Sequence, residues 1–194
     1  MYHGTLVFAT GNANKVKEVQ ALVGDDVAVK SLHDLGYFEE LSETHDTLEG
    51  NALEKAQFVF EKFGENCFSE DTGLEVEALN GEPGVYSARY AGPDKGAEDN
   101  MTLLLEKLKS QTNRKARFRT VISLIIDGKE FRFEGIVEGR ILEGRKGTAG
   151  FGYDPIFEPT GYDRSFAEMS LAEKAPISHR GKAVSQLLKF LKLF

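Results

Sequence analysis

The chain has 194 residues, of which 41% are hydrophobic and 28% charged, and its formal net charge is −7. This acidic balance excludes a surface that attracts a nucleic-acid polymer as a whole, so an anionic ligand needs a local cluster of positive groups. No apolar run in the sequence approaches the ~20 residues that span a bilayer, and the first residues lack the basic and apolar regions of a signal peptide. We therefore expect a cytoplasmic protein with neither a membrane nor a nucleic-acid partner.

A short apolar run at residues 5–9 precedes a polar loop and an amphipathic segment, which predicts a strand, a loop and a helix. Backbone N–H groups and the dipole at a helix start can bind an anion, and Lys15 adds a full charge. The loop lacks the glycine spacing of a Walker A motif, and a simple helix capped by Asn12 is the alternative. The candidate phosphate-binding residues are Thr10, Gly11, Asn12, Ala13, Asn14 and Lys15.

An acidic segment, residues 34–46, precedes a second helical pattern. Apolar residues recur at helical spacing through residues 48–63 and predict one buried stripe. Asn51 and Lys55 lie one turn apart on another face of this helix. They point either into a cleft or into solvent.

Two adjacent carboxylates, Glu70 and Asp71, follow an apolar run that contains Cys67, the single cysteine of the sequence. That cysteine excludes an internal disulfide framework, and its apolar neighbours favour a buried thiol. The Thr-Gly pair at residues 72–73 predicts that the strand ends in a polar turn, where active sites of open α/β sheets lie. Successive strand residues point to opposite faces, so one carboxylate is expected to do the chemistry; an ordinary acidic turn is the alternative.

The middle of the chain combines irregular and regular segments. Residues 81–92 are too irregular for a helix and too rich in aromatic residues for a linker, which predicts an ordered loop or lid. Residues 97–108 predict an amphipathic helix. Alternating apolar residues on both sides of Asp127 and Gly128 predict a long β-hairpin.

A glycine-rich segment with two aromatic rings follows at residues 147–157. Glycine lets a backbone approach a flat ligand closely, and Phe151 and Tyr153 could stack on a base. The composition is equally compatible with a nucleobase pocket and with a turn that its aromatic residues anchor to the core.

His179 and Arg180 fall in the first turn of the last amphipathic helix, where the helix dipole disfavours cations unless an anion is present. Lys174 adds a third positive group nearby. Basic helix starts bind phosphates, carboxylates hold a divalent cation and aromatic rings hold a base. The predicted ligand is therefore a nucleotide with Mg²⁺.

Five motifs, in this order, resemble the inosine triphosphate pyrophosphatase family, also called the Ham1 family. They are Thr10-Gly11-Asn12 with Lys15, residues 69–74, residues 81–90, residues 151–155, and Ser178-His179-Arg180. The resemblance implies an α/β fold whose elongated mixed sheet is flanked by helices, with the two lobes of a single domain, residues 1–194, around a central active-site cleft. It also implies a homodimer that hydrolyses ITP, dITP and XTP to the monophosphate and pyrophosphate and so cleans the nucleotide pool.

By resemblance, Asp71 is the general base and a Mg²⁺ ligand. Glu40 is favoured as the second metal ligand, with Glu43 and Glu70 as alternatives. The implied substrate-binding positions are Thr10, Gly11, Asn12, Ala13, Asn14, Lys15, Lys55, Thr72, Phe151, Gly152, Tyr153, Asp154, Lys174, His179 and Arg180. From the charges, we expect Asp71 to orient or deprotonate the water that attacks the α-phosphorus, while Mg²⁺ and Lys15 stabilise the departing pyrophosphate.

Two rival classes of function use similar groups. A nucleotide-binding regulator needs the basic helix starts and a base pocket but no general base. A phosphohydrolase of different base preference needs all of these groups, and a substrate panel separates it from the favoured function.

Overall fold

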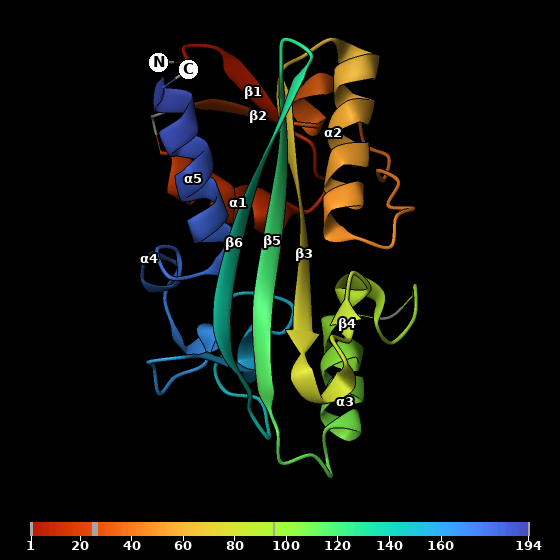
Figure 1. Cartoon of the computed structure of the whole chain (residues 1–194), viewed down its shortest axis with the longest axis vertical. Coiled ribbons are helices and arrows are strands. Elements are labelled where there is room, and N and C mark those ends of the chain that lie inside the picture. The colour runs from red at the N-terminus through yellow and green to blue at the C-terminus, as the bar shows by residue number, and fades with distance from the viewer. Residues whose placement is uncertain (1, 25–26, 95, 194) are drawn as a thin grey trace. The chain divides into compact units, whose positions relative to one another are not determined.

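The computed structural model describes residues 2–24, 27–94 and 96–193. The helices are α1 Ala13–Val23, α2 Leu48–Phe63, α3 Ala97–Lys107, α4 Leu171–Lys174 and α5 His179–Leu193. The strands are β1 Thr5–Phe8, β2 Ala28–Ser31, β3 Cys67–Val76, β4 Pro83–Gly84, β5 Lys115–Ile126, β6 Lys129–Ile141 and β7 Phe157–Pro159. Parallel pairs (β1 with β2 and β3) and antiparallel pairs (β3 with β4, β6 with β7) occur together, so the predicted mixed α/β class is confirmed (Figure 1).

The chain folds into two compact units. Unit 1 contains Met1–Asp71, Thr120–Gly135 and His179–Phe194, and unit 2 contains Thr72–Arg119 and Ile136–Ser178. The chain passes from one unit to the other within β3, β5 and β6, and again at the start of α5. The single domain with two lobes stays a prediction. No helix in the described ranges has the length and hydropathy of a membrane-spanning segment.

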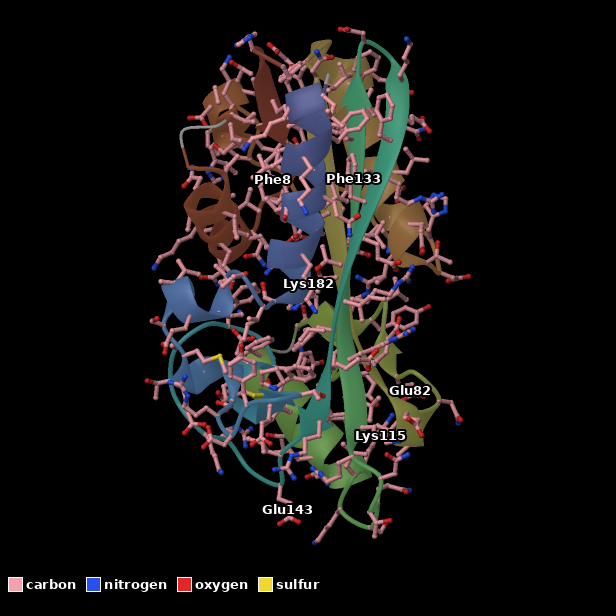
Figure 2. All side chains as sticks on the ribbon, turned by 60° about the vertical axis from the view of Figure 1, so that its left-hand side comes forward. Phe8, Glu82, Lys115, Phe133, Glu143 and Lys182 are labelled. Carbon is pink, nitrogen blue, oxygen red and sulfur yellow. The ribbon has the colours of Figure 1, made fainter. Side chains whose placement is uncertain are left out.

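Unit 1 has two apolar cores because β1 sends alternate side chains to opposite faces of its sheet. Leu6 and Phe8 pack with residues of α1 and α5, and Phe8 stacks on Phe68 with 4.6 Å between ring centroids. Val7 and Ala9 pack against α2 on the other face. In Figure 1, α1 and α5 accordingly lie on one side of β1 and α2 on the other, and in Figure 2 Phe8 and Phe133 both lie next to α5.

The helices of unit 1 begin and end where the sequence supplies caps. Asn12 accepts hydrogen bonds from the backbone N–H groups of Asn14 and Lys15 at the start of α1. Thr47 caps α2, which ends at Gly64 with a φ of 67°. The apolar stripe predicted over residues 48–63 is confirmed, since buried members of α2 recur at helical spacing.

The predicted hairpin is also present, because β5 and β6 are neighbours in the sheet. Asp127 and Gly128 connect the two strands with φ values of 50° and 75°. Two successive positive φ values characterise the type I′ turn that joins twisted strands, which accounts for the Asp-Gly pair.

Unit 2 has its own core. Leu74 and Val76 of β3 face the apolar residues of α3, while Phe118, Phe157 and Phe166 form an aromatic group. Residues 81–92 form an ordered segment that contains β4 and a 3₁₀ turn at Ser87–Arg89. The ordered loop predicted there is confirmed.

Cys67 is fully buried in unit 1, as its apolar neighbours predict. Its thiol donates a hydrogen bond to the Ala56 carbonyl at 3.2 Å, and burial raises its pKa to about 12. The reactive species of a cysteine is the thiolate. We therefore expect the native protein at pH 8 to resist a thiol reagent such as Ellman's reagent until denaturant is added. Stoichiometric reaction of the folded protein within minutes would contradict this placement.

Candidate active site

The two adjacent carboxylates lie inside β3 rather than at its end. β3 continues to Val76, so the polar turn predicted at residues 72–73 is wrong. Leu74 and Val76 supply apolar side chains for the core of unit 2, and β4 pairs with β3 at Leu74 and Glu75. A Cβ on Gly73 would approach the Gly84 carbonyl oxygen at 2.7 Å, so the glycine permits this close pairing and breaks no strand.

Glu70 and Asp71 point to opposite faces of β3, as the alternation of strand side chains predicts. Glu70 is fully buried and bonds to Arg180 of α5. Asp71 is 5% exposed and bonds to Asn51 of α2. The two carboxylates therefore have separate surroundings within unit 1.

On the α2 face, Asp71 is surrounded by an amide, an ammonium group and a second carboxylate. Asn51 Nδ2 donates to Asp71 Oδ2 at 3.2 Å, and Lys55 Nζ lies 3.8 Å from Asp71 Oδ1. The same Nζ donates to the Glu70 carbonyl at 2.9 Å and to Glu43 Oε1 at 2.5 Å. The face of α2 that carries Asn51 and Lys55 is thus buried against β3 and does not point into solvent. That it lines a cleft stays a prediction.

Burial raises the pKa of Asp71, because an ionised carboxylate is less stable away from water. Lys55 and Lys15 oppose this shift electrostatically, and Glu43 adds to it. A carboxylate with a raised pKa is a better proton acceptor than an ordinary aspartate, which suits a general base. This is the electrostatic arrangement expected for the residue predicted to activate water.

On the α5 face, Glu70 takes part in a buried ion network. Arg180 donates from Nε and Nη2 to the two Glu70 oxygens at 2.7 and 2.8 Å, and its Nη1 bonds to Glu18. Lys15 Nζ lies 3.1 Å from Glu70 Oε1. Burial alone would raise the pKa of Glu70, but Arg180 and Lys15 outweigh it and hold that pKa well below its usual range. Glu70 therefore remains ionised and acts as a counter-ion rather than as a proton acceptor.

This network explains the position of Arg180 at the start of α5. His179 and Arg180 are both buried, and the glycine at position 135 of β6 lets the first turn of α5 approach, since a Cβ there would collide with the His179 carbonyl. The anion expected near Arg180 is supplied by Glu70 and Glu18 of the protein itself. Glu18 was not among the predicted site residues. A role of His179 and Arg180 in substrate binding stays a prediction.

At the start of α1, the alternative of an Asn-capped helix is present: the Asn12 side chain accepts from two backbone N–H groups, and Thr10 Oγ1 accepts from the Asn12 N–H. Gly11, Ala13 and Asn14 are exposed. The helix start is thus accessible, and Lys15 brings its ammonium group to Glu70. Phosphate binding by residues 10–15 stays a prediction.

The acidic segment brings Glu43, rather than Glu40, into the contacts of Asp71. Glu43 shares Lys55 with Asp71, whereas the Glu40 side chain is exposed. Among the described residues, no three His, Cys, Asp or Glu side chains form a metal-binding group. Proteins commonly hold Mg²⁺ through one or two carboxylates and leave its other positions to water and substrate phosphates. The oxygen donors of Asp71 and Glu43 fit such a site.

In unit 2, the residues predicted around the glycine-rich segment form a second cluster. Lys174 Nζ pairs with Asp154 Oδ2 at 2.6 Å in a buried contact, and Asp154 accepts from the Phe151 N–H at 3.0 Å. Lys174 Nζ also lies 5.3 Å from the centre of the Phe151 ring. Gly150 has a φ of 73°, and a Cβ there would collide with Asp154.

Tyr153 is 5% exposed and donates from its hydroxyl to the Ser87 carbonyl at 2.8 Å. Its ring is therefore anchored in the core of unit 2. This agrees with the alternative in which aromatic residues anchor the turn to the core. Phe151 is half-buried. Thr72, the first residue of unit 2, follows Asp71 directly in β3. Substrate binding by Thr72, Phe151, Gly152, Tyr153, Asp154 and Lys174 stays a prediction.

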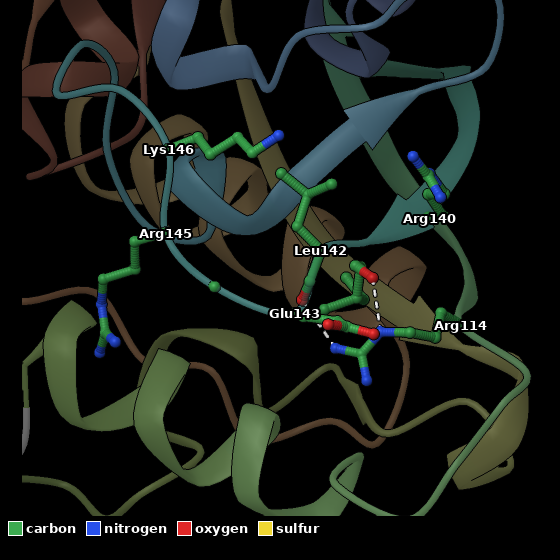
Figure 3. Close-up of a pocket in the computed structure, with 8 residues that line it drawn as sticks. Arg114, Arg140, Leu142, Glu143, Arg145 and Lys146 are labelled. Atoms are coloured by element: carbon green, nitrogen blue, oxygen red, sulfur yellow. Dashed lines mark hydrogen bonds between the residues drawn. The ribbon is translucent and has the colours of Figure 1, made fainter.

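A hollow of about 360 Å³ in unit 2 is lined by basic side chains but by none of the predicted site residues (Figure 3). The Arg114 guanidinium donates to the backbone carbonyls of Leu108, Ile141 and Leu142. Arg140 and Arg145 pair instead with Glu158 and Glu98. The basic groups diverge in Figure 3, so they do not converge on one ligand.

Comparison with known proteins identifies the family. The model of the Ham1 family matches residues 6–190. A dITP/XTP pyrophosphatase of Flavobacterium johnsoniae is 54% identical over 186 residues, covering 96% of this chain and 97% of that protein. One from Porphyromonas gingivalis is 52% identical over 188 residues, covering 96% of each.

Solved structures agree with this assignment. The Ham1 protein of Staphylococcus aureus is 39% identical with a TM-score of 0.88, covering 97% of this chain and 98% of that one. A structure from Mycobacterium abscessus described as a nucleoside-triphosphatase / dITP/XTP pyrophosphatase is 38% identical with a TM-score of 0.76, covering 95% and 99%. The resemblance first seen in five sequence motifs is confirmed, and the chain belongs to the Ham1 family.

Proposed function

We propose that this protein is a nucleoside triphosphate pyrophosphatase that hydrolyses dITP, ITP and XTP to the monophosphate and pyrophosphate. The observation that carries the proposal is the surroundings of Asp71: a buried carboxylate of raised pKa that lies beside Lys55 and bonds to Asn51. Relatives that match nearly the whole chain are named dITP/XTP pyrophosphatases. Removal of such nucleotides would keep them out of the nucleotide pool.

Charge neutralisation is the first requirement of the reaction. A nucleoside triphosphate carries roughly four negative charges, which repel an attacking oxygen. Lys15 and Lys55 supply positive charge within unit 1, and the exposed start of α1 supplies backbone N–H groups and its dipole. We assign the triphosphate to these groups.

Asp71 supplies the base. Its carboxylate would take a proton from a water molecule whose oxygen forms a bond to the α-phosphorus, while the bond from that phosphorus to the oxygen bridging to the β-phosphorus breaks. The bridging oxygen leaves with pyrophosphate, and Lys15 stabilises its charge. The raised pKa of Asp71 favours the transfer, because the protonated form costs less here than in an exposed aspartate.

Asp71 and Glu43 are the residues that would hold Mg²⁺. The resemblance favours Glu40 instead of Glu43 as the second ligand. When bound, Mg²⁺ supplies further neutralisation of the phosphate oxygens. Lys55 bridges the two carboxylates through Nζ, at 3.8 and 2.5 Å. It therefore offsets part of their mutual repulsion.

Base selection follows from hydrogen bonding. Hypoxanthine and xanthine present an acceptor at O6 and a donor at N1, whereas adenine presents the reverse. A pocket that donates to O6 leaves polar groups unpaired with ATP, and such mismatches can reduce kcat/KM by ~10⁴-fold or more. We propose Phe151 and Tyr153 as residues that frame the base, and backbone amides of the same segment as donors.

A substrate panel tests the function. We expect the purified protein with Mg²⁺ to release pyrophosphate from dITP, ITP and XTP, with kcat/KM for ATP lower by ~10⁴-fold. Chelation of the metal with EDTA should abolish release, and added Mg²⁺ should restore it. Binding of ITP without release of pyrophosphate would indicate a regulator, and equal turnover of ATP or of pyrimidine triphosphates would indicate a different phosphohydrolase.

Two further properties concern the location and the assembly of the protein. We propose that the protein works in the cytoplasm, where the nucleotide pool lies, and that it is a homodimer. Light scattering after size-exclusion chromatography measures the second directly: a mass near 43 kDa, twice the 21.5 kDa of the chain, is expected.

A further inference from the structure

Asn51 is a fully buried residue of α2 whose side-chain amide both donates and accepts a hydrogen bond. Its Nδ2 donates to Asp71 Oδ2 at 3.2 Å, and its Oδ1 accepts from the His45 backbone N–H at 2.9 Å. A buried amide with these two partners connects the predicted base directly to the acidic segment. Loss of either partner would leave a buried polar group unsatisfied, which is costly.

Three successive residues of the acidic segment form ion pairs or hydrogen bonds with side chains of α2. Glu43 Oε1 meets Lys55 Nζ at 2.5 Å, and both the N–H and the hydroxyl of Thr44 donate to the Glu54 carboxylate, at 2.8 and 2.9 Å. The third attachment, from His45 to Asn51, is the one that continues to Asp71. The position of Glu43 relative to Asp71 therefore depends on the side chains of one helix.

The helix itself is held against β3 beside this attachment. The Ser69 hydroxyl donates to the Ala52 carbonyl, and the Cys67 thiol donates to the Ala56 carbonyl at 3.2 Å. Both carbonyls follow Asn51 in α2, so these bonds hold the helical backbone directly after Asn51 against β3. An amide on a backbone held in this way can keep a carboxylate in one orientation.

We propose that Asn51 is a positioning residue of the reaction, an inference that rests on the proposed function. Its donor fixes the orientation of the Asp71 carboxylate, and its acceptor keeps the Glu43 segment aligned with that carboxylate. Asparagine suits both tasks because it presents a donor and an acceptor at the same time, whereas aspartate at this position would present acceptors alone.

Two variants separate the two hydrogen bonds. Asn51→Ala removes both, and Asn51→Asp keeps the acceptor for His45 but removes the donor to Asp71. We expect each to reduce kcat for dITP by about 10- to 100-fold, the usual effect of removing a group that orients a reactive residue. KM should change by less than about threefold, because Asn51 acts through Asp71 and not through the substrate.

Asn100 offers a matched control in unit 2. It is 3% exposed, accepts from the Ala91 N–H at 2.7 Å and donates to the Ala88 carbonyl at 3.1 Å. Asn100→Ala therefore removes a buried amide of the same kind whose hydrogen bonds join it to Ala88 and Ala91 and not to Asp71. We expect its Tm to fall as much as that of Asn51→Ala while its kcat stays within about twofold of the wild-type value.

Two further readouts distinguish positioning from mere destabilisation. In an Asp71→Asn background, Asn51→Ala should reduce kcat no further than about twofold, because the group that it positions is already gone. Without substrate or metal, the His45 amide should lose its protection from hydrogen exchange, followed by NMR, in Asn51→Ala and keep it in Asn51→Asp.

Three results would overturn the inference: kcat of Asn51→Ala within about twofold of wild type, a full additional loss in the Asp71→Asn background, or a His45 amide equally protected in both variants. The proposed function is judged separately, by whether the wild-type protein releases pyrophosphate. If it does not, the exchange of the His45 amide still decides whether Asn51 holds the segment.

Discussion

Replacement of Asp71 with Asn is expected to reduce kcat for dITP by about 10³-fold or more while the fold remains intact. The amide cannot accept the proton of the attacking water and is a weaker ligand for Mg²⁺. Its shape is nearly the same, so Asn51 can still donate to the side-chain oxygen, and Lys55 keeps Glu43 and the Glu70 carbonyl as partners. Steady-state release of pyrophosphate measures the loss.

The same substitution should raise thermal stability. Because the pKa of Asp71 is raised in the folded protein, its ionised form opposes folding at pH 7, and a neutral amide removes this cost. A rise in stability with a loss of turnover is the trade-off expected where a buried group is kept for chemistry. The Tm of the variant, measured without substrate, should therefore exceed that of the wild type.

Asp34→Asn is the matched control for this substitution. Asp34 accepts from the N–H and the hydroxyl of Ser31 at 2.7 and 2.8 Å, and these bonds lower its pKa. The same chemical change should there reduce stability slightly and leave kcat unchanged. Near-native turnover of Asp71→Asn with Mg²⁺, or a loss no larger than that of Asp34→Asn, would contradict the assignment of Asp71.

Replacement of Arg180 with Met is expected to lower the free energy of unfolding by about 3–5 kcal/mol at pH 7. Arg180 is 1% exposed, and its guanidinium bonds to Glu70 and Glu18 at once. The variant removes the cation that lies between these two buried carboxylates. Lys15, 3.1 Å from Glu70, remains as a cationic neighbour of Glu70. Urea denaturation measures the difference.

The pH dependence of this difference follows from the sign of the pKa shift. The pKa of Glu70 is lowered in the folded protein from its ordinary value of 4.5, so its ion pair stabilises the fold fully above about pH 4.5. That stabilisation is lost as the pH falls through the lower, folded-state pKa. The gap between wild type and Arg180→Met should therefore be widest at neutral pH and narrow below pH 4.5.

Arg117→Met controls for the loss of a positive charge. Arg117 Nε lies 2.6 Å from Glu75 Oε2, but its side chain is 44% exposed, so the pair is solvated. We expect a loss below about 1 kcal/mol. Equal losses in the free energy of unfolding for the two variants would show that burial of the Arg180 network adds nothing to stability.

Local pattern was enough to predict several elements. The alternation around residues 127–128 predicted the hairpin, and helical spacing over residues 48–63 predicted the buried stripe of α2. The period of two in a strand also predicted that Glu70 and Asp71 face opposite ways, and they bond to different helices. Each of these features depends on residues that lie close together in sequence.

Features that depend on distant residues could not be predicted. The continuation of β3 beyond Gly73 depends on pairing with β4, and the burial of Glu18 depends on Arg180, 162 positions away. A glutamate one turn after Lys15 gives no signal of its own that it will be buried. The choice of the glutamate that lies near Asp71 likewise depends on a distant residue, Lys55. In the structure Lys55 contacts both Glu43 and Asp71.

Hydrolysis of dITP in water enriched in ¹⁸O tests most directly whether water attacks the α-phosphorus. If Asp71 directs water there, the label will appear in dIMP, and the pyrophosphate will carry none. Mass spectrometry of the two products after a single turnover gives the answer. Label in the pyrophosphate, or the formation of dIDP and inorganic phosphate, would contradict the proposed reaction.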